Sequence, residues 1–370
     1  MTPVVVGGAL ANKAGSGGEA WVRMSWVRGL QRLGLDVWFV EEVARAAGAG
    51  YFRTVVGQFG LEDRATLLHG DDALAGPSLE DLLAIAPSAV LVNISGHLTH
   101  PRLFPRFRSR VLVDIDPGFT QAWYAAGNAG ARVEGHDLHF TIAERIGEPD
   151  CAIPTAGIHW RTVRQPVVLD DWPVTPVGDP GRFTTVGTWR GPFGPLELDG
   201  RTYGLKVHQF RRFIELPRHS SHRFELALDI HPGDAADRAA LVEHGWRLVD
   251  PKPAAADPLD FRSYVQGSGA EFSVAQGVYV DTRSGWFSDR TVRYLASGRP
   301  ALVQETGFSE TLRAGMGLVG FSTLAGAVAG AADIVDRYDA HAGAARELAR
   351  RCFGSDMVLG RFCDEAGIVG

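Results

Sequence analysis

The stretch SGWFSDRTVRYLASGRP, at residues 284–300, has the residue types best suited to binding an anion. Ser288, Asp289 and Arg290 come at the predicted start of a short helix. A helix start leaves backbone N–H groups unpaired and carries the positive end of the helix dipole. With Arg290 beside these groups, the segment suits a phosphate or a diphosphate. The alternative is that Ser288 only caps the helix and that Arg290 is a solvated side chain.

Three further sites in the second half of the chain offer polar groups beside predicted strands or helices. Glu305, Thr306 and Gly307 follow a predicted buried strand, and Glu305 could accept hydrogen bonds from a sugar or ribose hydroxyl. His231 follows another predicted strand in DIHPGD, where a lone histidine is usually structural. Lys206 opens a predicted helix and could neutralise a phosphate, with an ordinary surface lysine as the alternative.

The first half of the chain carries a glycine-rich turn and two groups that could move a proton. Gly17 and Gly18 lie in KAGSGGEA, between a predicted strand and a helix, where backbone N–H groups can approach a ligand. This turn lacks the GxGxxG spacing of dinucleotide sites and the GK[ST] ending of a P-loop. Asp116 and His97 each follow a predicted strand, so either could act as a general base on a hydroxyl. The Asp-Pro-Gly run at Asp116 is also ordinary turn chemistry.

Alternating apolar runs and amphipathic stretches predict the elements that position these groups. Residues 3–8 read as a buried strand, residues 18–34 as a helix and residues 35–42 as a second strand, which together form a βαβ unit. Further β-type runs cover residues 89–96, 110–118 and 138–144. Because an open α/β sheet keeps its chemistry at the carboxyl ends of its strands, the polar loops after these runs are the expected site.

Residues 153–183 contain five prolines and interrupt the alternation, which predicts a crossover between two domains. After it the alternation restarts, with elements expected at residues 182–189, 205–216, 224–230, 235–245, 246–251, 271–280 and 300–307. We therefore predict an N-terminal domain at residues 1–165, a C-terminal domain at 166–345 and a C-terminal helix at 346–370 that packs across both. Two α/β domains joined in this way place a cleft between their strand ends, and such clefts hold extended ligands.

Composition limits the classes of function. The chain has 370 residues, 45% of them apolar and 22% charged, as expected for a globular protein of two domains. The net charge of −6 gives no global reason to bind nucleic acid or anionic lipid. The three cysteines form no CxxC pair, which argues against disulfides and zinc and favours the cytoplasm. We expect no metal site, and no membrane span because no window approaches the roughly 20 apolar residues that a span needs.

Two segments of the sequence resemble the glycosyltransferases of the GT-B fold, in which two Rossmann-like domains hold a nucleotide-sugar donor in their cleft. SGGEAWVRMSWVRGLQRLGLDVWFVEE, at residues 16–42, is similar to the glycine loop, helix and strand that open many such enzymes. SGWFSDRTVRYLASGRPALVQETGFS, at residues 284–309, looks like their donor-binding segment. Together with TVGTW and LKVHQF, the pattern resembles a bacterial group usually labelled only as glycosyltransferases.

The resemblance implies roles for the residues already singled out. Residues 288–290 would lie at the diphosphate with Lys206 beside it, and residues 305–307 would lie near the donor sugar or ribose. Arg293 occupies the position of a glutamate in the retaining families, and residues 285–287 replace the His-Gly-Gly turn of some inverting families. The stereochemical outcome and the nucleotide therefore stay open.

The resemblance leads us to expect an enzyme that moves a sugar from a nucleoside diphosphate sugar to a small-molecule acceptor, without a metal or other cofactor. Asp116, or else His97, would remove the acceptor proton. Two alternatives stay open: a nucleotide-sugar epimerase with the same fold, and a non-catalytic protein that binds a nucleotide sugar. Nucleic acid is not an expected partner, and the sequence favours no particular oligomeric state.

Overall fold

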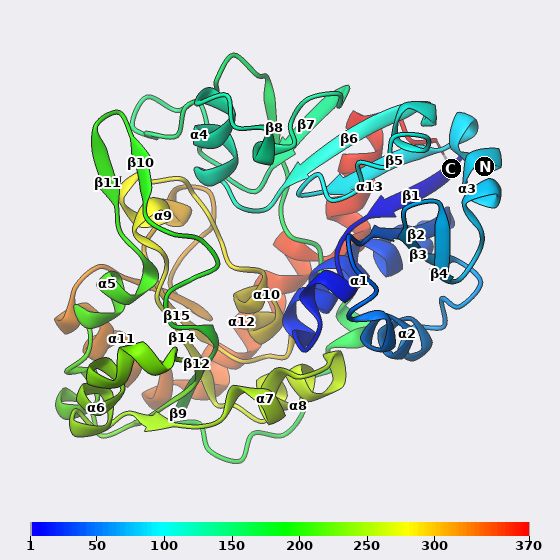
Figure 1. Ribbon diagram of the computed structural model, residues 1–370. Helices are drawn as coiled ribbons and strands as arrows, with labels where there is room; N and C mark the ends of the chain where they lie inside the picture. The colour runs from blue at the N-terminus through cyan, green and yellow to red at the C-terminus, as the bar shows by residue number, and fades with distance from the viewer. Residues whose placement is uncertain (1, 370) are drawn as a thin grey trace.

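The computed structural model describes residues 2–369 and shows two α/β halves, each built on its own sheet (Figure 1). The elements of the first half are β1 (Pro3–Gly7), α1 (Gly17–Arg32), β2 (Asp36–Glu42), α2 (Ala49–Gln58), β3 (Ala65–His69), β4 (Asp72–Ala75), α3 (Leu79–Ile85), β5 (Val90–Ile94), β6 (Ser109–Asp114), α4 (Phe119–Ala125), β7 (Leu138–Thr141) and β8 (Trp160–Thr162). The sheet has the order β4-β3-β2-β1-β5-β6-β7-β8, and β4 alone of its strands is antiparallel to its neighbour.

The central strands of this sheet are buried on both faces because helices cover both sides. Val4, Val5 and Val6 of β1 are almost completely buried, as are Leu91 and Val92 of β5. Near-continuous apolar strands of this kind are typical of parallel sheets. The order reverses direction between β1 and β5, so loops at the carboxyl ends of these strands leave a crevice there.

The second half repeats this architecture with a six-stranded, fully parallel sheet. Its elements, with the closing helices, are β9 (Arg182–Thr188), β10 (Leu196–Leu198), β11 (Arg201–Tyr203), α5 (Lys206–Arg211), β12 (Arg223–Asp229), α6 (Ala235–Glu243), β13 (Arg247–Leu248), α7 (Pro251–Ala255), α8 (Pro258–Gln266), β14 (Ala270–Ser273), α9 (Gly277–Asp281), α10 (Asp289–Ala296), β15 (Ala301–Gln304), β16 (Leu318–Phe321), α11 (Leu324–Asp336), α12 (Tyr338–Phe353) and α13 (Ser355–Ala366). The order β13-β12-β9-β14-β15-β16 is the 3-2-1-4-5-6 order of Rossmann folds.

Two expected elements differ in the structure. Residues 271–280 are not one element, because β14 ends at Ser273 and α9 begins at Gly277. Gly277 packs so closely on the backbone of Gly204 that a Cβ would lie 2.8 Å from its carbonyl oxygen, which fixes the turn between the two elements. The expected helix at 205–216 is α-helical only to Arg211.

The two halves share an apolar contact through α1. Trp21 of α1 packs against Trp172 of the crossover with ring centroids 4.9 Å apart, and its indole N–H donates to the Pro258 carbonyl of α8. At the other end of the chain, Phe362 of α13 packs on Trp26 of α1. α1 thus lies between the second half and the last helix (Figure 1). No helix among residues 2–369 is long and apolar enough to cross a membrane.

Candidate functional site in the interdomain cleft

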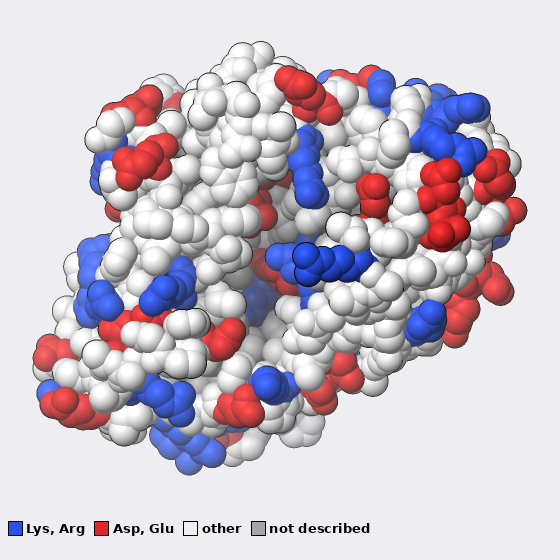
Figure 2. Space-filling model, in the orientation of Figure 1, with Lys and Arg blue, Asp and Glu red and all other residues white. Residues whose placement is uncertain are grey.

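A cavity of about 690 Å³ lies between the two halves and is lined by residues from both. Figure 2 shows the hollow, with Lys and Arg as well as Asp and Glu side chains at its border. Loops after β1, β5 and β6 form one wall, and loops after β9 and β14 with the start of α10 form the other. This volume lies in the range of small-molecule sites, and the place is where paired α/β sheets keep their ligands.

Arg290 lies on the C-terminal wall, where β9 and β14 end. Its Nε donates to the carboxylate of buried Glu271 at 2.6 Å, Nη1 to the Val186 carbonyl at 3.0 Å and Nη2 to the Ser273 hydroxyl at 2.8 Å. A guanidinium has five N–H donors, so two remain for a ligand in the cavity. Arg290 is therefore a fixed cation at the carboxyl edge of the second sheet.

Lys206 lies beside Arg290 at the start of α5. A Cβ on Gly187 would lie 3.6 Å from both Arg290 Nη1 and Lys206 Nζ, so the two cations flank the end of β9. Burial, and secondly the charge of Arg290, lower the pKa of Lys206 to about 7. An anion bound between the two side chains would relieve this repulsion, and phosphate is the anion that suits such a pair.

The start of α10 completes this wall. Ser288 is the N-cap residue but makes no side-chain capping bond, and it is only 4% exposed. Ser288, Asp289 and Arg290 all line the cavity, and their predicted contact with a diphosphate stays a prediction. Burial raises the pKa of the Asp289 carboxyl. The unpaired N–H groups of the first turn add to the positive potential of the two cations.

Two aspartates at the end of β6, Asp114 within the strand and Asp116 after it, have different environments. Asp114 is buried and accepts hydrogen bonds from Gln121, Thr141 and Thr120 side chains and from the Asp116 N–H. Asp116 lines the cavity, and its carboxylate has no hydrogen bond with the described residues. Burial, then the charges of Glu19 and Asp114, raise the pKa of Asp116 to about 7. A carboxylate with this pKa is a capable base near neutral pH.

His97, which follows β5, also lines the cavity. Its Nδ1 lies 3.3 Å from Nη1 of Arg132. Burial, then the charges of Arg23 and Arg132, lower the pKa of His97 to about 3. The imidazole is therefore neutral at physiological pH and can exchange hydrogen bonds with a ligand without carrying charge.

The glycine-rich turn has a packing role. A Cβ on Gly17 would lie 1.9 Å from the Asp257 carbonyl oxygen, and one on Gly18 would lie 3.1 Å from the Phe261 ring. These glycines let α1 approach α8, and neither is among the residues lining the cavity. Their predicted contact with a donor stays a prediction, and the structure gives the close helix packing as a sufficient reason for both glycines.

The other residues predicted to contact the donor make hydrogen bonds within the protein. His231 is exposed and accepts a hydrogen bond from the Gly233 N–H at 3.0 Å. Glu305 accepts the N–H groups of Thr306 and Gly307 at 3.1 and 2.7 Å. The Thr306 hydroxyl donates to the Trp286 carbonyl at 2.6 Å. None of these four residues lines the cavity, and their contact with a donor stays a prediction.

Arg293, which stands where the retaining families have a glutamate, connects the two halves. It is fully buried and donates to the Asp289 carbonyl at 2.6 Å, to the Trp21 carbonyl at 3.1 Å and to the Ser25 hydroxyl at 3.2 Å. Two of these acceptors belong to α1. The side chain therefore fixes α10 against the first half rather than facing the cavity.

Several lining residues were not predicted. The charged, aliphatic hydroxyl and amide side chains among them are Lys13, Ser16, Glu19, Arg23, Ser95, Thr120, Arg132, Gln165, Thr188 and Gln276. Glu19 and Arg23 form an ion pair one helical turn apart, a spacing that could have been found in the sequence. Arg132 and Gln165 come from an irregular loop and the crossover, where no local pattern marks them. Within residues 2–369, no group of three or more His, Cys, Asp or Glu side chains is placed to hold a metal ion.

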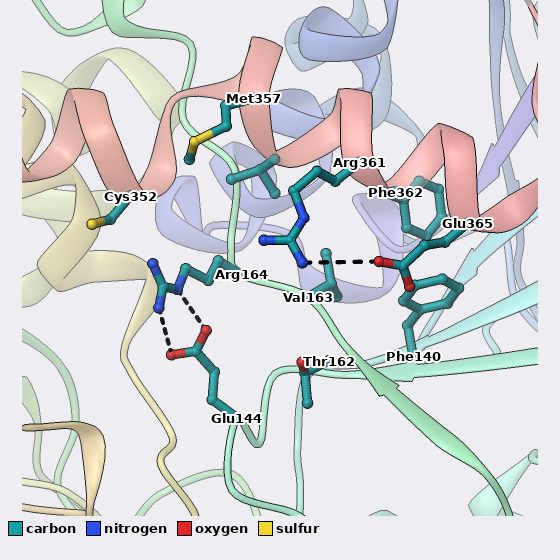
Figure 3. Close-up of a pocket in the computed structure, with 11 residues that line it drawn as sticks. Phe140, Glu144, Thr162, Val163, Arg164, Cys352, Met357, Arg361, Phe362 and Glu365 are labelled. Carbon is teal, nitrogen blue, oxygen red and sulfur yellow. Dashed lines mark hydrogen bonds and ion pairs between the residues drawn. The ribbon is translucent and has the colours of Figure 1, made fainter. Parts of the chain in front are cut away.

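A second pocket, between the crossover and the C-terminal helices, has a volume of about 120 Å³. Figure 3 shows Arg164 pointing at Glu144, with its Nε 2.5 Å from the carboxylate, and Arg361 turned toward Glu365 at 4.0 Å. This pocket is far smaller than the interdomain cavity, and these charged groups are already paired. Between these two pockets, the interdomain cavity is the candidate site.

Comparisons with known proteins agree with this architecture. No protein-family model and no curated protein matches the chain. Among solved structures, it is similar to Anabaena HepE in complex with UDP and glucose, with a TM-score of 0.62 and 10% identity over 100% of both chains. An alpha-glucosyltransferase in complex with UDP and a 13-mer DNA has a TM-score of 0.60 and 10% identity over 99% of each chain. Sucrose-phosphate synthase from Thermosynechococcus elongatus has a TM-score of 0.54 and 11% identity over 99% of each chain. The fold expected from the sequence is thus confirmed: the chain has the GT-B fold, with two Rossmann-like domains facing each other across a cleft.

Proposed function

We propose that this protein is a glycosyltransferase that moves a sugar from a nucleoside diphosphate sugar to a hydroxyl group of a small-molecule acceptor. The observation that carries the proposal is the pairing of groups across one cavity. Lys206, Arg290 and the start of α10 form a wall suited to a diphosphate, and Asp116 lines the facing wall with a pKa near neutrality. For glycosyl transfer a protein must stabilise the departing diphosphate and supply a base for the acceptor hydroxyl.

In the proposed reaction, the bond between the sugar's anomeric carbon and the diphosphate oxygen breaks, and a bond to the acceptor oxygen forms. Asp116 takes the proton of the acceptor hydroxyl. The diphosphate leaves with its bonding electrons, and its growing negative charge is stabilised by Lys206, Arg290 and the first-turn N–H groups of α10. These fixed positive groups supply the charge stabilisation for the phosphates, so we propose that transfer needs no divalent metal.

The ligands bound in similar structures support a uridine diphosphate donor. HepE was solved with UDP and glucose, and also with UDP-glucose. The alpha-glucosyltransferase was solved with UDP and a 13-mer DNA, so a protein of this fold also binds a macromolecule. For the present chain the net charge of −6 disfavours a nucleic acid, which supports the small-molecule acceptor.

The first experiment is a thermal-shift comparison of UDP, GDP, dTDP and ADP, because a ligand that binds only the folded state raises its melting temperature. We expect UDP to give the largest shift. Lys206→Met should reduce it, and Lys252→Met serves as the matched control because Lys252 is exposed on α7 and does not line the cavity. No shift with any nucleotide would overturn the donor assignment.

A turnover assay separates transfer from the two alternatives. Release of UDP from UDP-glucose that increases with acceptor, and persists with EDTA, supports a metal-independent transferase. Conversion of the donor sugar without any acceptor would instead identify an epimerase. Tight UDP-glucose binding with no turnover across a broad acceptor panel would favour the non-catalytic binder.

A further inference from the structure

We propose that the acceptor carries an anionic group, a phosphate or a carboxylate, and that Arg132 and Lys13 bind this group on the N-terminal wall of the cleft. The inference rests on the proposed function, because it names the class of acceptor for that reaction. It begins from side chains that the donor site does not use.

Arg132 and Lys13 are the unpaired cations of this wall. Both line the cavity, and neither has a carboxylate within ion-pair distance among residues 2–369. Arg23, the other cation of the wall, is already paired with Glu19. On the opposite wall, Lys206 and Arg290 are placed for the donor phosphates, so the first wall keeps positive charge for a second anion.

His97 can assist as a neutral donor. A guanidinium can only donate, so the contact of Arg132 Nη1 with His97 Nδ1 makes Nδ1 the acceptor. The proton of the neutral imidazole then resides on Nε2, which leaves an N–H for a ligand. The charges of the cations around it keep the pKa of His97 low, after the larger effect of burial.

Polar atoms on the same wall lack partners. The Oγ atom of Ser95 and the Oε1 atom of Gln165 are buried, and neither has a hydrogen bond within the described chain. Gln165 is only 4% exposed, and both residues line the cavity. An unpaired buried polar atom destabilises the protein, because it has given up its hydrogen bonds to water. A hydroxylated anion in this position would provide partners for them.

The backbone holds Arg132 in this place under strain. Arg132 has φ of 52° and Ser95 has φ of 54°, in the left-handed region that such residues rarely adopt. Gly96, which follows Ser95, lets this loop approach the loop that carries Arg132. Any side chain at Gly96 would be too close, since its Cβ would lie 2.7 Å from Cβ of Arg132. Strain of this kind collects at functional sites, where the surrounding structure maintains it.

The test is a titration of the UDP-saturated protein with inorganic phosphate, and separately with acetate, against chloride at equal ionic strength. UDP occupies the donor wall, so binding reports the second site. Arg132→Gly removes the guanidinium and suits the left-handed backbone, so the fold should be kept. Arg132→Lys keeps the charge, and Arg351→Gln is the control, because Arg351 is exposed on α12 and does not line the cavity.

We expect at least one of the two anions to bind the wild type, and its Kd to rise about tenfold or more in Arg132→Gly. Arg132→Lys should recover part of the affinity, and Arg351→Gln should match the wild type. Equal affinity in the wild type and Arg132→Gly, or no binding of either anion beyond chloride, would overturn the anionic acceptor. Failure of UDP itself to bind would instead overturn the proposed function, so the two failures are distinct.

Discussion

The two walls of the cleft differ in how their polar groups are held. On the C-terminal wall, Arg290 makes three hydrogen bonds to the protein, including one to buried Glu271. On the N-terminal wall, the Asp116 carboxylate has no hydrogen bond within the described chain, and buried atoms of Ser95 and Gln165 are unpaired. The C-terminal wall also has one unpaired buried atom, Oε1 of Gln276, but its central cation is fixed before any ligand arrives, whereas the carboxylate of the N-terminal wall still has its hydrogen bonds to make.

This difference indicates that the two walls have different roles in the proposed reaction. A fixed cation is pre-organised for the diphosphate and needs no rearrangement when the leaving group develops charge. Asp116 has instead a raised pKa and a free carboxylate, which are the properties of a group that exchanges a proton. Burial raises the pKa of Asp114, at the end of β6, as well, but its carboxylate accepts four hydrogen bonds and supports the structure, so the two aspartates differ in their bonding.

The largest effect on activity should come from Asp116→Asn. Removing a general base lowers turnover by about 10²–10⁴-fold. The folded-state pKa of Asp116 is above its ordinary value, so its charge destabilises the folded protein increasingly as pH rises from about 4 to about 7. At pH 8 the variant should therefore melt at the same temperature as the wild type or slightly higher. Turnover within threefold of the wild type would exclude Asp116 as the base.

Asp114→Asn is the matched control, for which we expect an effect on stability rather than on turnover. Its carboxylate accepts four hydrogen bonds, and an amide nitrogen would face some of these donors. We expect a loss of about 2 kcal/mol in the free energy of unfolding. If the two variants had the same melting temperature, the contrast between the aspartates would be wrong.

Arg290→Ala should chiefly affect stability. Removal of one partner leaves buried Glu271 as an uncompensated charge, which costs about 3–5 kcal/mol in unfolding free energy. Adding Glu271→Gln in a double variant should restore much of this stability while donor binding stays weak. Chemical denaturation of the wild type, both single variants and the double variant measures the coupling. An additive result would show that the pair is not coupled.

Lys206→Met should lower kcat/KM about 10²–10³-fold with little loss of stability. The reason is that Lys206 has no carboxylate partner within the described residues, and its lowered pKa shows that the folded environment disfavours its charge. Steady-state kinetics and a melting curve on the same preparation separate the two effects. A large drop in melting temperature with unchanged kinetics would show that Lys206 supports the structure and does not act on the donor.

The pH dependence of kcat/KM should be bell-shaped around neutrality. Below about pH 7 Asp116 gains a proton and loses its function as a base, and above about pH 7 Lys206 loses its proton and its charge. Each limb should approach a tenfold change per pH unit. A profile from pH 5 to 9 tests both limbs, and Asp116→Asn should lack the acidic one. A flat profile between pH 5 and 7 would contradict the raised pKa.

The smallest effect should come from His231→Ala. His231 is exposed and accepts one hydrogen bond within its own turn, so the variant should lose about 0.5–2 kcal/mol in unfolding free energy, as for other caps. The UDP affinity should be unchanged. A marked loss of UDP affinity would restore the predicted donor role of this residue.

The sequence predicted the fold from features that act locally. Buried apolar runs such as residues 3–7 and the helical spacing of Trp21 and Met24 depend on neighbours in the chain, so they can be read without the tertiary structure. Ser288 and Arg290 were found in the same way, because a helix start is a local feature. Gly17 and Gly18 mark the limit of such local features, because a glycine that admits a close helix and one that admits a close ligand look alike in the sequence; the structure shows the close helix, and the ligand contact stays a prediction.

What the sequence by itself determined is therefore the set of elements, their α/β order and the groups at single strand or helix ends. The tertiary structure decided which of these ends meet. It placed Asp116 and Arg290, 174 positions apart in the chain, on facing walls of one cavity, and added Arg132 and Gln165 from irregular segments. It also set the charge states, since the raised pKa of Asp116 and the lowered pKa of Lys206 arise from burial and from charges brought close by folding.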